Sequence, residues 1–332
     1  MIETRELSKS FGTRRGVLAA VKGLDLSVEA GEIFGFLGPN GAGKTTTLRM
    51  LATLLSSDGG EAWVAGRDLL REPARVRERI GYVSQTGGAE EAATGRENLV
   101  LQARLYGLGK REAREKAGAL ISALDLSAFA DRVVKTYSGG QRRRLDLALG
   151  MVHGPGLLFL DEPTVGLDLQ SRARLWDEIR RLREEKATVF LTTHYLDEAD
   201  ALCDRLCIID DGAIVAEGTP AALKRQISGD IVALGVEEGN GELARARELL
   251  RGQQFVREVE VGEGALRLYV ERGEEALPVI LGLLDGSGLG VRGISLSRPT
   301  LDDVFLKKTG RSLREAEQHD ERQTLVRVMN PR

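Results

Sequence analysis

Residues Gly31–Leu55 of this 332-residue chain, GEIFGFLGPNGAGKTTTLRMLATLL, carry the clearest indication of its fold. It opens with an apolar run between glycines, which predicts a short buried strand. It closes with leucines at helical spacing, which predict a helix over residues 44–55. A glycine-rich loop joins the two. Strand, loop and helix in this order are typical of an α/β domain that holds an anion at the helix start.

The loop itself, GPNGAGKT, fits the pattern G-x-x-x-x-G-K-[ST] at every fixed position. Its glycines allow backbone N–H groups to turn toward an anion, and the helix that follows directs its positive end at phosphates. Lys44 would place a charge near the β- and γ-phosphate oxygens, and the Thr45 hydroxyl would ligate Mg²⁺. The residues predicted to contact a nucleotide here are Gly38, Pro39, Asn40, Gly41, Ala42, Gly43, Lys44, Thr45 and Thr46.

An acidic pair follows another apolar run, LLFLDE. The run predicts a buried strand that carries Asp161 and Glu162 to its end. Paired acids at a strand end are commonly no more than a polar terminus. Beside a complete phosphate loop we expect Asp161 to hold Mg²⁺ and Glu162 to polarise the attacking water as a general base.

A second anion-binding pattern lies in YSGGQRRRLDLALG, residues Tyr137–Gly150. Ser138 is a good helix N-cap, and apolar residues behind it keep a helical stripe. Ser138, Gly139 and Gly140 would therefore present a hydroxyl and backbone N–H groups at a helix N-terminus. The arginines 142–144 are interpreted as a solvated helix face.

Strands and helices alternate along most of the first 225 residues, which predicts an α/β fold with a mainly parallel sheet. Residues 94–153 interrupt the alternation and predict a helical insertion, which opens with a capping box at Thr94 and Glu97. Residues 229–310 suggest strand, helix, hairpin, helix and strand, a small ferredoxin-like α+β domain. The charged tail, 311–332, is expected to be a frayed helix or disordered.

Charge, cysteine content and hydrophobicity reduce the number of functional classes to which the protein could belong. Lysine and arginine number 47 against 50 acidic residues, a net charge of −3, so we expect no general affinity for nucleic acid. Cys203 and Cys207 suggest buried structural thiols rather than a disulfide framework or metal set. Charged residues interrupt the start of the chain, and no apolar run approaches the ~18 residues that span a bilayer. We expect a soluble, cytoplasmic protein that reaches the membrane only through a partner.

Residues 2–223 resemble the ATP-binding-cassette (ABC) family. YSGGQ is a close variant of the family's LSGGQ signature, and GYVSQ, GLD and LTTHYLDEAD follow the family's order. The resemblance implies a P-loop NTPase cassette with antiparallel N-terminal strands, and it implies ATP and Mg²⁺ as ligands. It implies that Phe11 stacks on adenine, although a core role for Phe11 stays open. It implies that the catalytic residues are Lys44, Gln85, Glu162 and His194. It also implies that the metal is bound by Thr45, Gln85 and Asp161.

The resemblance also implies an assembly. In this family Ser138, Gly139, Gly140, Gln141 and Asp168 meet the nucleotide held by a second, head-to-tail cassette, so one cassette per chain implies a homodimer. GTPAALK and RPTLDDVFLKKTG resemble the daunorubicin-resistance branch, whose ATPases drive export through a separate ABC-2-type permease. An importer ATPase, a soluble ABC ATPase of DNA repair or translation, and a non-enzymatic regulator are the alternatives. The role of the C-terminal domain stays open between dimer stabilisation, regulation and permease assembly.

Overall fold

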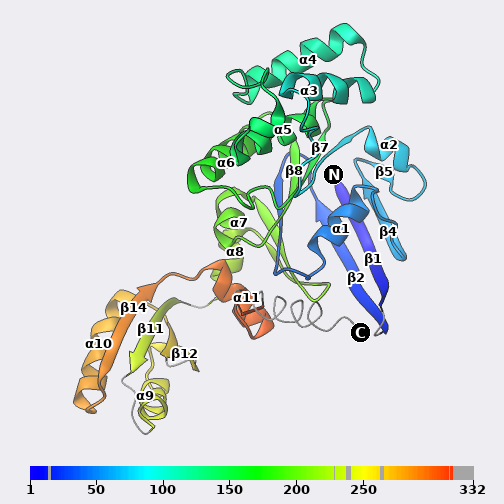
Figure 1. Ribbon diagram of the computed structural model, residues 1–332. Coiled ribbons are helices and arrows are strands. Elements are labelled where there is room, and N and C mark those ends of the chain that lie inside the picture. Colours follow the sequence, from blue (N-terminus) through cyan, green and yellow to red (C-terminus); the bar gives the residue numbers. More distant parts are fainter. Residues whose placement is uncertain (14–15, 228, 237–240, 262–264, 314, 317–332) are drawn as a thin grey trace. The chain divides into compact units, whose positions relative to one another are not determined.

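The computed structural model describes the chain except residues 14–15, 228, 237–240, 262–264, 314 and 317–332 (Figure 1). Most of the predicted charged tail therefore lies outside the described residues. The chain forms two compact units, one of Met1–Pro220 with the described residues after Ser312, and one of Ala221–Ser312. The division falls at the start of α8 (Pro220–Arg225), a few residues earlier than the boundary that the sequence suggested.

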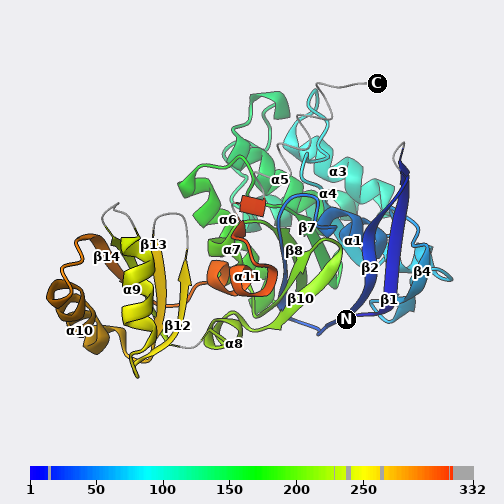
Figure 2. The same cartoon turned by 90° about the horizontal axis from the view of Figure 1, so that it is seen from below.

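The first unit contains an antiparallel sheet formed early in the chain (Figures 1 and 2). Its strand order is β2-β1-β4-β5, and neighbouring strands pair antiparallel. This agrees with the predicted antiparallel N-terminal strands. The bounds are β1 (Ile2–Thr13), β2 (Gly16–Val28), β4 (Gly59–Val64) and β5 (Arg67–Asp68).

A second sheet of six strands follows the order β10-β9-β3-β8-β7-β6. All neighbours are parallel except β9 and β10, so the prediction of a mainly parallel sheet is confirmed. The strands β3, β7 and β8 are buried at every position, as parallel strands covered on both faces must be. The bounds are β3 (Ile33–Leu37), β6 (Ile80–Val83), β7 (Leu157–Asp161), β8 (Thr188–Thr193), β9 (Arg205–Asp210) and β10 (Ala213–Gly218).

Helix α1 (Lys44–Leu51) joins the two sheets, because it contacts β2 of one and β7 and β8 of the other. Its buried leucines share one core with Phe159 and Phe190 of the parallel sheet. The helix is shorter than the sequence predicted. Thr53 has a left-handed φ of 61°, which ends the helix and leaves Leu54 57% exposed.

The helical insertion is present, but its first part is two helices rather than one long helix. They are α3 (Gly95–Leu105) and α4 (Lys110–Ala123), and Gly107 between them has a φ of 88°. The predicted capping box at Thr94 and Glu97 is confirmed. The insertion ends in α5 (Gly139–Met151), which contacts α3 and β6 (Figure 1).

The other helical elements of the first unit are short, apart from α6. Helix α6 contacts β8 and α7 contacts β3, so both pack against the parallel sheet. The bounds are α2 (Pro73–Arg77), η1 (Val134–Thr136), α6 (Leu169–Glu184) and α7 (Leu196–Leu202).

The second unit has its own sheet and its own core. From β11 onward its elements follow the order strand, helix, strand, strand, helix, strand and a final helix, and the sheet order is β12-β13-β11-β14 with antiparallel neighbours. Leu234, Leu268 and Ile280 are fully buried in its core. The bounds are β11 (Asp230–Val236), α9 (Glu242–Arg251), β12 (Val256–Val261), β13 (Ala265–Val270), α10 (Gly273–Gly286), β14 (Val291–Ser297) and α11 (Leu301–Thr309).

Candidate active site

The glycine loop that follows β3 closes tightly over the start of α1. Gly43 precedes the helix with a φ of 102°, a conformation that only glycine adopts easily. The Lys44 ammonium donates to the backbone oxygens of Gly38 at 2.7 Å and Pro39 at 3.0 Å. The lysine is only 4% exposed. The loop thus holds a buried positive charge beside a helix N-terminus, where an anion is favoured.

Three polar side chains meet at one edge of the parallel sheet. Gln85 follows β6, Glu162 follows β7 and His194 follows β8, and these three strands are parallel neighbours. The amide Nε2 of Gln85 donates to Glu162 Oε2 at 2.9 Å. The His194 Nδ1 lies 3.3 Å from Glu162 Oε1, and the Lys44 Nζ lies 3.4 Å from the same oxygen. Glu162 is therefore the centre of this cluster.

The backbone of Glu162 is strained and fastened at the same time. Its φ is 45°, an unusual value for a residue with a side chain. Its N–H donates to the Thr192 backbone oxygen at 3.1 Å and to the Thr192 hydroxyl at 3.0 Å. Burial pulls the pKa of Glu162 upward, but the His194 hydrogen bond and the Lys44 charge outweigh burial and hold that pKa below its ordinary value. The carboxylate is thus ionised at neutral pH.

Asp161 forms a second polar group one residue earlier. Its Oδ1 accepts from the Thr45 hydroxyl at 3.0 Å and from the Thr192 hydroxyl at 2.8 Å. The side chain is 2% exposed and joins the glycine loop to β7 and β8. Thr45 and Asp161 together offer hydroxyl and carboxylate oxygens, the donor set that Mg²⁺ prefers.

A cavity of about 590 Å³ opens beside these groups. Phe11 lines it and is 37% exposed, so the structure places the predicted adenine-stacking residue at the cavity rather than in the core. Gly38 and Ala42 belong to the same loop, but both are buried and neither lines the cavity. The cavity-lining residues are Phe11, Leu18, Ala20, Asn40, Gly41, Gly43, Lys44, Thr45, Thr46, Gln85, Glu162, Val165 and His194.

The second anion-binding pattern lies apart from this cavity. Ser138 caps α5 through a capping box with Gln141, and both Ser138 and Gly139 are exposed. Asp168 caps α6 by accepting from the Ser171 N–H at 2.8 Å, and it is exposed as well. The Ser138–Gln141 stretch and Asp168 do not line the cavity of their own chain.

Comparisons with known proteins agree with this geometry. Residues 21–165 match the family model described as ABC transporter, and residues 218–309 match the C-terminal domain of DrrA1-3-like ATP-binding proteins. The chain is 46% identical over 311 residues to the daunorubicin/doxorubicin resistance ATP-binding protein DrrA of Streptomyces peucetius, which covers 93% of this chain and 92% of that protein.

Two further likenesses extend this result. The linearmycin resistance ATP-binding protein LnrL of Bacillus subtilis is 34% identical, covering 95% of this chain and 100% of that protein. The dimeric structure of MJ0796, a bacterial ABC transporter cassette, has a TM-score of 0.61 at 25% identity, over 66% of this chain and 98% of that one. The chain belongs to the ABC transporter family.

As an ABC ATPase, the chain binds and hydrolyses ATP. The resemblance inferred from the sequence is confirmed, including its daunorubicin-resistance branch. Within the described residues, no helix has the length and apolar character needed to cross a bilayer. Cys203 and Cys207 are buried thiols.

One arginine of the ABC signature helix is not solvated as predicted. Arg143 belongs to the run 142–144 that was expected to form a solvated face, yet it is only 7% exposed. Its guanidinium donates to the backbone oxygens of Pro163 at 2.7 Å, Ser84 at 2.6 Å and Asp161 at 3.1 Å. Three consecutive residues cover about 200° of a helix surface, so on a helix that is buried over most of its surface one of the three arginines can face inward.

Two other contacts were not foreseen. Thr192 carries the hydrogen bonds that place both Asp161 and Glu162. Tyr137, which replaces the usual leucine of the ABC signature, donates its hydroxyl to the Phe129 backbone oxygen at 2.7 Å. That hydroxyl leaves no room for a side chain at Gly95, so the tyrosine ties the signature to the start of α3.

Proposed function

We propose that this chain is the ATPase subunit of an exporter that moves a drug, antibiotic or lipid-like molecule through a separate ABC-2-type permease. The observation that carries the proposal is the match of residues 218–309 to the C-terminal domain of DrrA1-3-like proteins. Full-length similarity to proteins named for daunorubicin, doxorubicin and linearmycin resistance supports it. The Nod factor export ATP-binding protein I of Burkholderia orbicola, 38% identical, also bears an export name.

We propose Glu162 as the general base of hydrolysis. Its ionised carboxylate lies at the cavity, 2.9 Å from Gln85 and 3.3 Å from His194. Such a carboxylate can accept a proton from a water that attacks the γ-phosphate. His194 would orient the carboxylate beside the cavity that would hold the γ-phosphate, and Gln85 would hold the other carboxylate oxygen. Lys44 contributes the positive charge that the β- and γ-phosphates require.

Mg²⁺ fits the oxygen set beside this base. Thr45 Oγ1 and Asp161 Oδ1, 3.0 Å apart, would hold it, and Gln85, which lines the same cavity as Thr45, would contribute its amide oxygen. When bound, the ion supplies neutralisation of the charge on the transferred phosphoryl group. The described chain supplies few protein ligands here, as is usual for Mg²⁺ that is shared with nucleotide phosphates.

We propose that two copies assemble head to tail. Ser138, Gly139 and Asp168 are exposed and lie outside their own cavity, so each is available to a second chain. The N-terminus of α5 offers N–H groups to an anion, and a γ-phosphate held by a partner's glycine loop would provide one. The dimeric cassette of MJ0796 supports this arrangement. The assembly would sit at the cytoplasmic face of the membrane, bound there by the permease.

Recovery of the assembly from native membranes tests the proposal. A tagged chain is expected to co-purify with a polytopic membrane protein, and ATP hydrolysis should accompany the complex. Mass spectrometry of the co-purified protein identifies the permease. Repeated recovery of no polytopic partner would contradict the exporter proposal, and stimulation of the ATPase by DNA or ribosomes would favour a soluble ABC enzyme instead.

A further inference from the structure

Helix α5 begins at an exposed N-terminus but carries two buried charged side chains farther along. Arg143 is 7% exposed and Asp146, three residues later, is 5% exposed. Charged groups are rarely buried unless their polar atoms are paired, because desolvation of an ion is costly. Both side chains form hydrogen bonds with the backbone of segments that carry Gln85 and Glu162.

Arg143 binds the backbone on each side of the general base. Its Nε donates to Pro163 O at 2.7 Å and its Nη2 donates to Asp161 O at 3.1 Å. These two carbonyls flank Glu162 in the chain. The third donor, Nη1, reaches Ser84 O at 2.6 Å, one residue before Gln85. One rigid guanidinium thus spans both catalytic segments.

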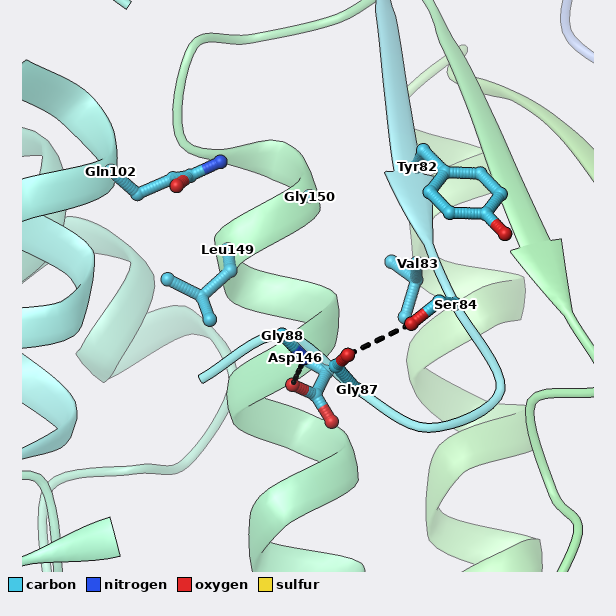
Figure 3. A pocket seen from close by; sticks show the side chains of 9 residues that line it. All are labelled: Tyr82, Val83, Ser84, Gly87, Gly88, Gln102, Asp146, Leu149 and Gly150. Carbon is cyan, nitrogen blue, oxygen red and sulfur yellow. Dashed lines mark hydrogen bonds between the residues drawn. The ribbon is translucent and has the colours of Figure 1, made fainter. Parts of the chain in front are cut away.

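Asp146 fastens the other side of the Gln85 turn (Figure 3). Its Oδ1 accepts from the Gly88 N–H at 3.1 Å, and the Ser84 hydroxyl closes the turn by donating to Gly87 O at 2.8 Å. Gly87 has a φ of 78°, and a Cβ there would lie 2.6 Å from Asp146 Oδ2. Gln85 therefore sits in a closed turn whose two ends are both attached to α5.

The helix that carries these two side chains is itself fixed against β6, the strand that leads into the turn. A Cβ on Gly81 of β6 would overlap the Gly150 backbone oxygen of α5. A Cβ on Gly150 would lie 2.8 Å from Val83 Cγ2. This close approach of two backbones fixes the register of α5 on the strand.

We propose that Arg143 and Asp146 are positioning residues that attach the Gln85 turn and the Glu162 backbone to the signature helix. The inference rests on the roles proposed for Gln85 and Glu162. Movement of α5 when its N-terminus meets a second cassette is then transmitted directly to the two groups that act on water. Neither Arg143 nor Asp146 lines the nucleotide cavity, so their loss reduces turnover more than ATP binding.

Substitutions that keep the apolar volume test this idea. Arg143→Met retains the stem of the side chain and leaves three carbonyls without their donor. Arg143→Lys keeps a positive charge but lacks the planar set of N–H donors that a guanidinium presents. Asp146→Leu removes the acceptor for Gly88, and Asp146→Asn retains it. The control is Arg144→Gln, because the Arg144 guanidinium contacts Asp125 and the Phe129 ring within the helical insertion.

The readouts are kcat, KM for ATP, the affinity for ATP, and Tm. Arg143→Met and Asp146→Leu are expected to lower kcat roughly tenfold or more while KM stays within about threefold. Arg143→Lys and Asp146→Asn should fall between these variants and the wild type, and Arg144→Gln should keep its kcat. Gln85→Ala should lower kcat less in the Arg143→Met background than in the wild type, because Gln85 is already misplaced there.

The outcomes separate this inference from the proposed function. The positioning inference is overturned if folded Arg143→Met and Asp146→Leu keep the wild-type kcat. It is also overturned if Gln85→Ala lowers kcat by the same factor with and without Arg143→Met. If Arg143→Met does not fold, Arg143→Lys and Asp146→Leu decide by the same criteria. If Glu162→Gln and Gln85→Ala leave kcat unchanged, the proposed catalytic roles fail, and the positioning inference fails with them.

Discussion

Gln85 and Glu162 are 77 residues apart in the chain, yet the amide nitrogen of one lies 2.9 Å from a carboxylate oxygen of the other. The contact exists because β6 and β7 are parallel neighbours and both side chains follow the carboxyl ends of their strands. Backbone hydrogen bonds hold Glu162 at a strained φ of 45°, and contacts with Gln85, His194 and Lys44 hold its carboxylate. A preorganised base of this kind should be sensitive to loss of its charge.

Glu162→Gln is expected to keep ATP binding and to slow hydrolysis by about 10²- to 10⁴-fold, the usual contribution of a general base. Glutamine retains the shape of the side chain and one acceptor oxygen, but it cannot accept the proton. ATP should then accumulate in a stable dimer, which size-exclusion chromatography and a bound-nucleotide assay would detect. The exposed Glu184→Gln is the control and should hydrolyse ATP normally. Rapid turnover by Glu162→Gln would contradict the assignment.

Much of this site follows from local patterns. The glycine loop, its lysine and its threonine are contiguous, so one motif specifies them together with their strand and helix. Gln85, Glu162 and His194 each follow an apolar strand, and parallel strands bring their ends to one edge of a sheet. These residues were predicted individually, and the structure brings them into contact.

The contacts of Arg143 were not predictable in the same way. Three consecutive arginines have the polarity of a solvated face, and only the packing of α5 against β6 decides which one points inward. The partners of Arg143 are backbone carbonyls, and because every residue has one, the sequence cannot indicate which of them it binds. The end of α1 was missed for a similar reason, because the left-handed Thr53 has no sequence signal comparable to a glycine.

Gly81→Ala and Gly150→Ala should each destabilise the cassette by about 1–3 kcal/mol, the range for overpacking a filled interior. In both cases the new methyl group meets atoms of the partner segment, the Gly150 backbone or the Val83 side chain. Urea unfolding would give the loss in free energy of unfolding.

Gly118→Ala provides the matched control. Gly118 lies in α4, and a Cβ built there meets no neighbouring atom within 4 Å. Because alanine favours a helix over glycine by about 0.5–1 kcal/mol, this variant should be slightly more stable than the wild type. Equal effects at residues 81 and 118 would mean that α5 and β6 are not packed as tightly as described.

Glu198→Gln should stabilise the protein at high pH. Glu198 of α7 is fully buried, and burial raises its pKa although the Trp176 Nε1 donates to it at 3.0 Å. When the pKa of a glutamate is higher in the folded than in the unfolded protein, its ionisation lowers the free energy of unfolding. This loss is complete above the pKa in the folded state, and it disappears as the pH falls toward the unfolded value of about 4.3. Glutamine keeps an acceptor for Trp176 without the charge. Each 1 kcal/mol gained should raise Tm by about 2–4 °C.

The test is the Tm difference between Glu198→Gln and the wild type from pH 5 to pH 8. The difference is expected to be largest at pH 8 and to shrink toward pH 5. Glu184→Gln, an exposed change of the same kind, should show no such trend. A variant that is less stable than the wild type at every pH would mean that the ionised form of Glu198 supports the fold.

A mixture of two inactive chains tests the shared active site. Lys44→Ala removes the phosphate-binding charge of a chain's own site, and Ser138→Arg blocks the helix N-terminus that we propose serves its partner. A head-to-tail heterodimer of the two has one site with both lesions and one intact site. It should recover up to about half of the wild-type ATPase rate if the sites work independently. Each variant assayed alone is the control. ATP hydrolysis by the Ser138→Arg homodimer would contradict the proposal, because Ser138 would then serve no nucleotide at all.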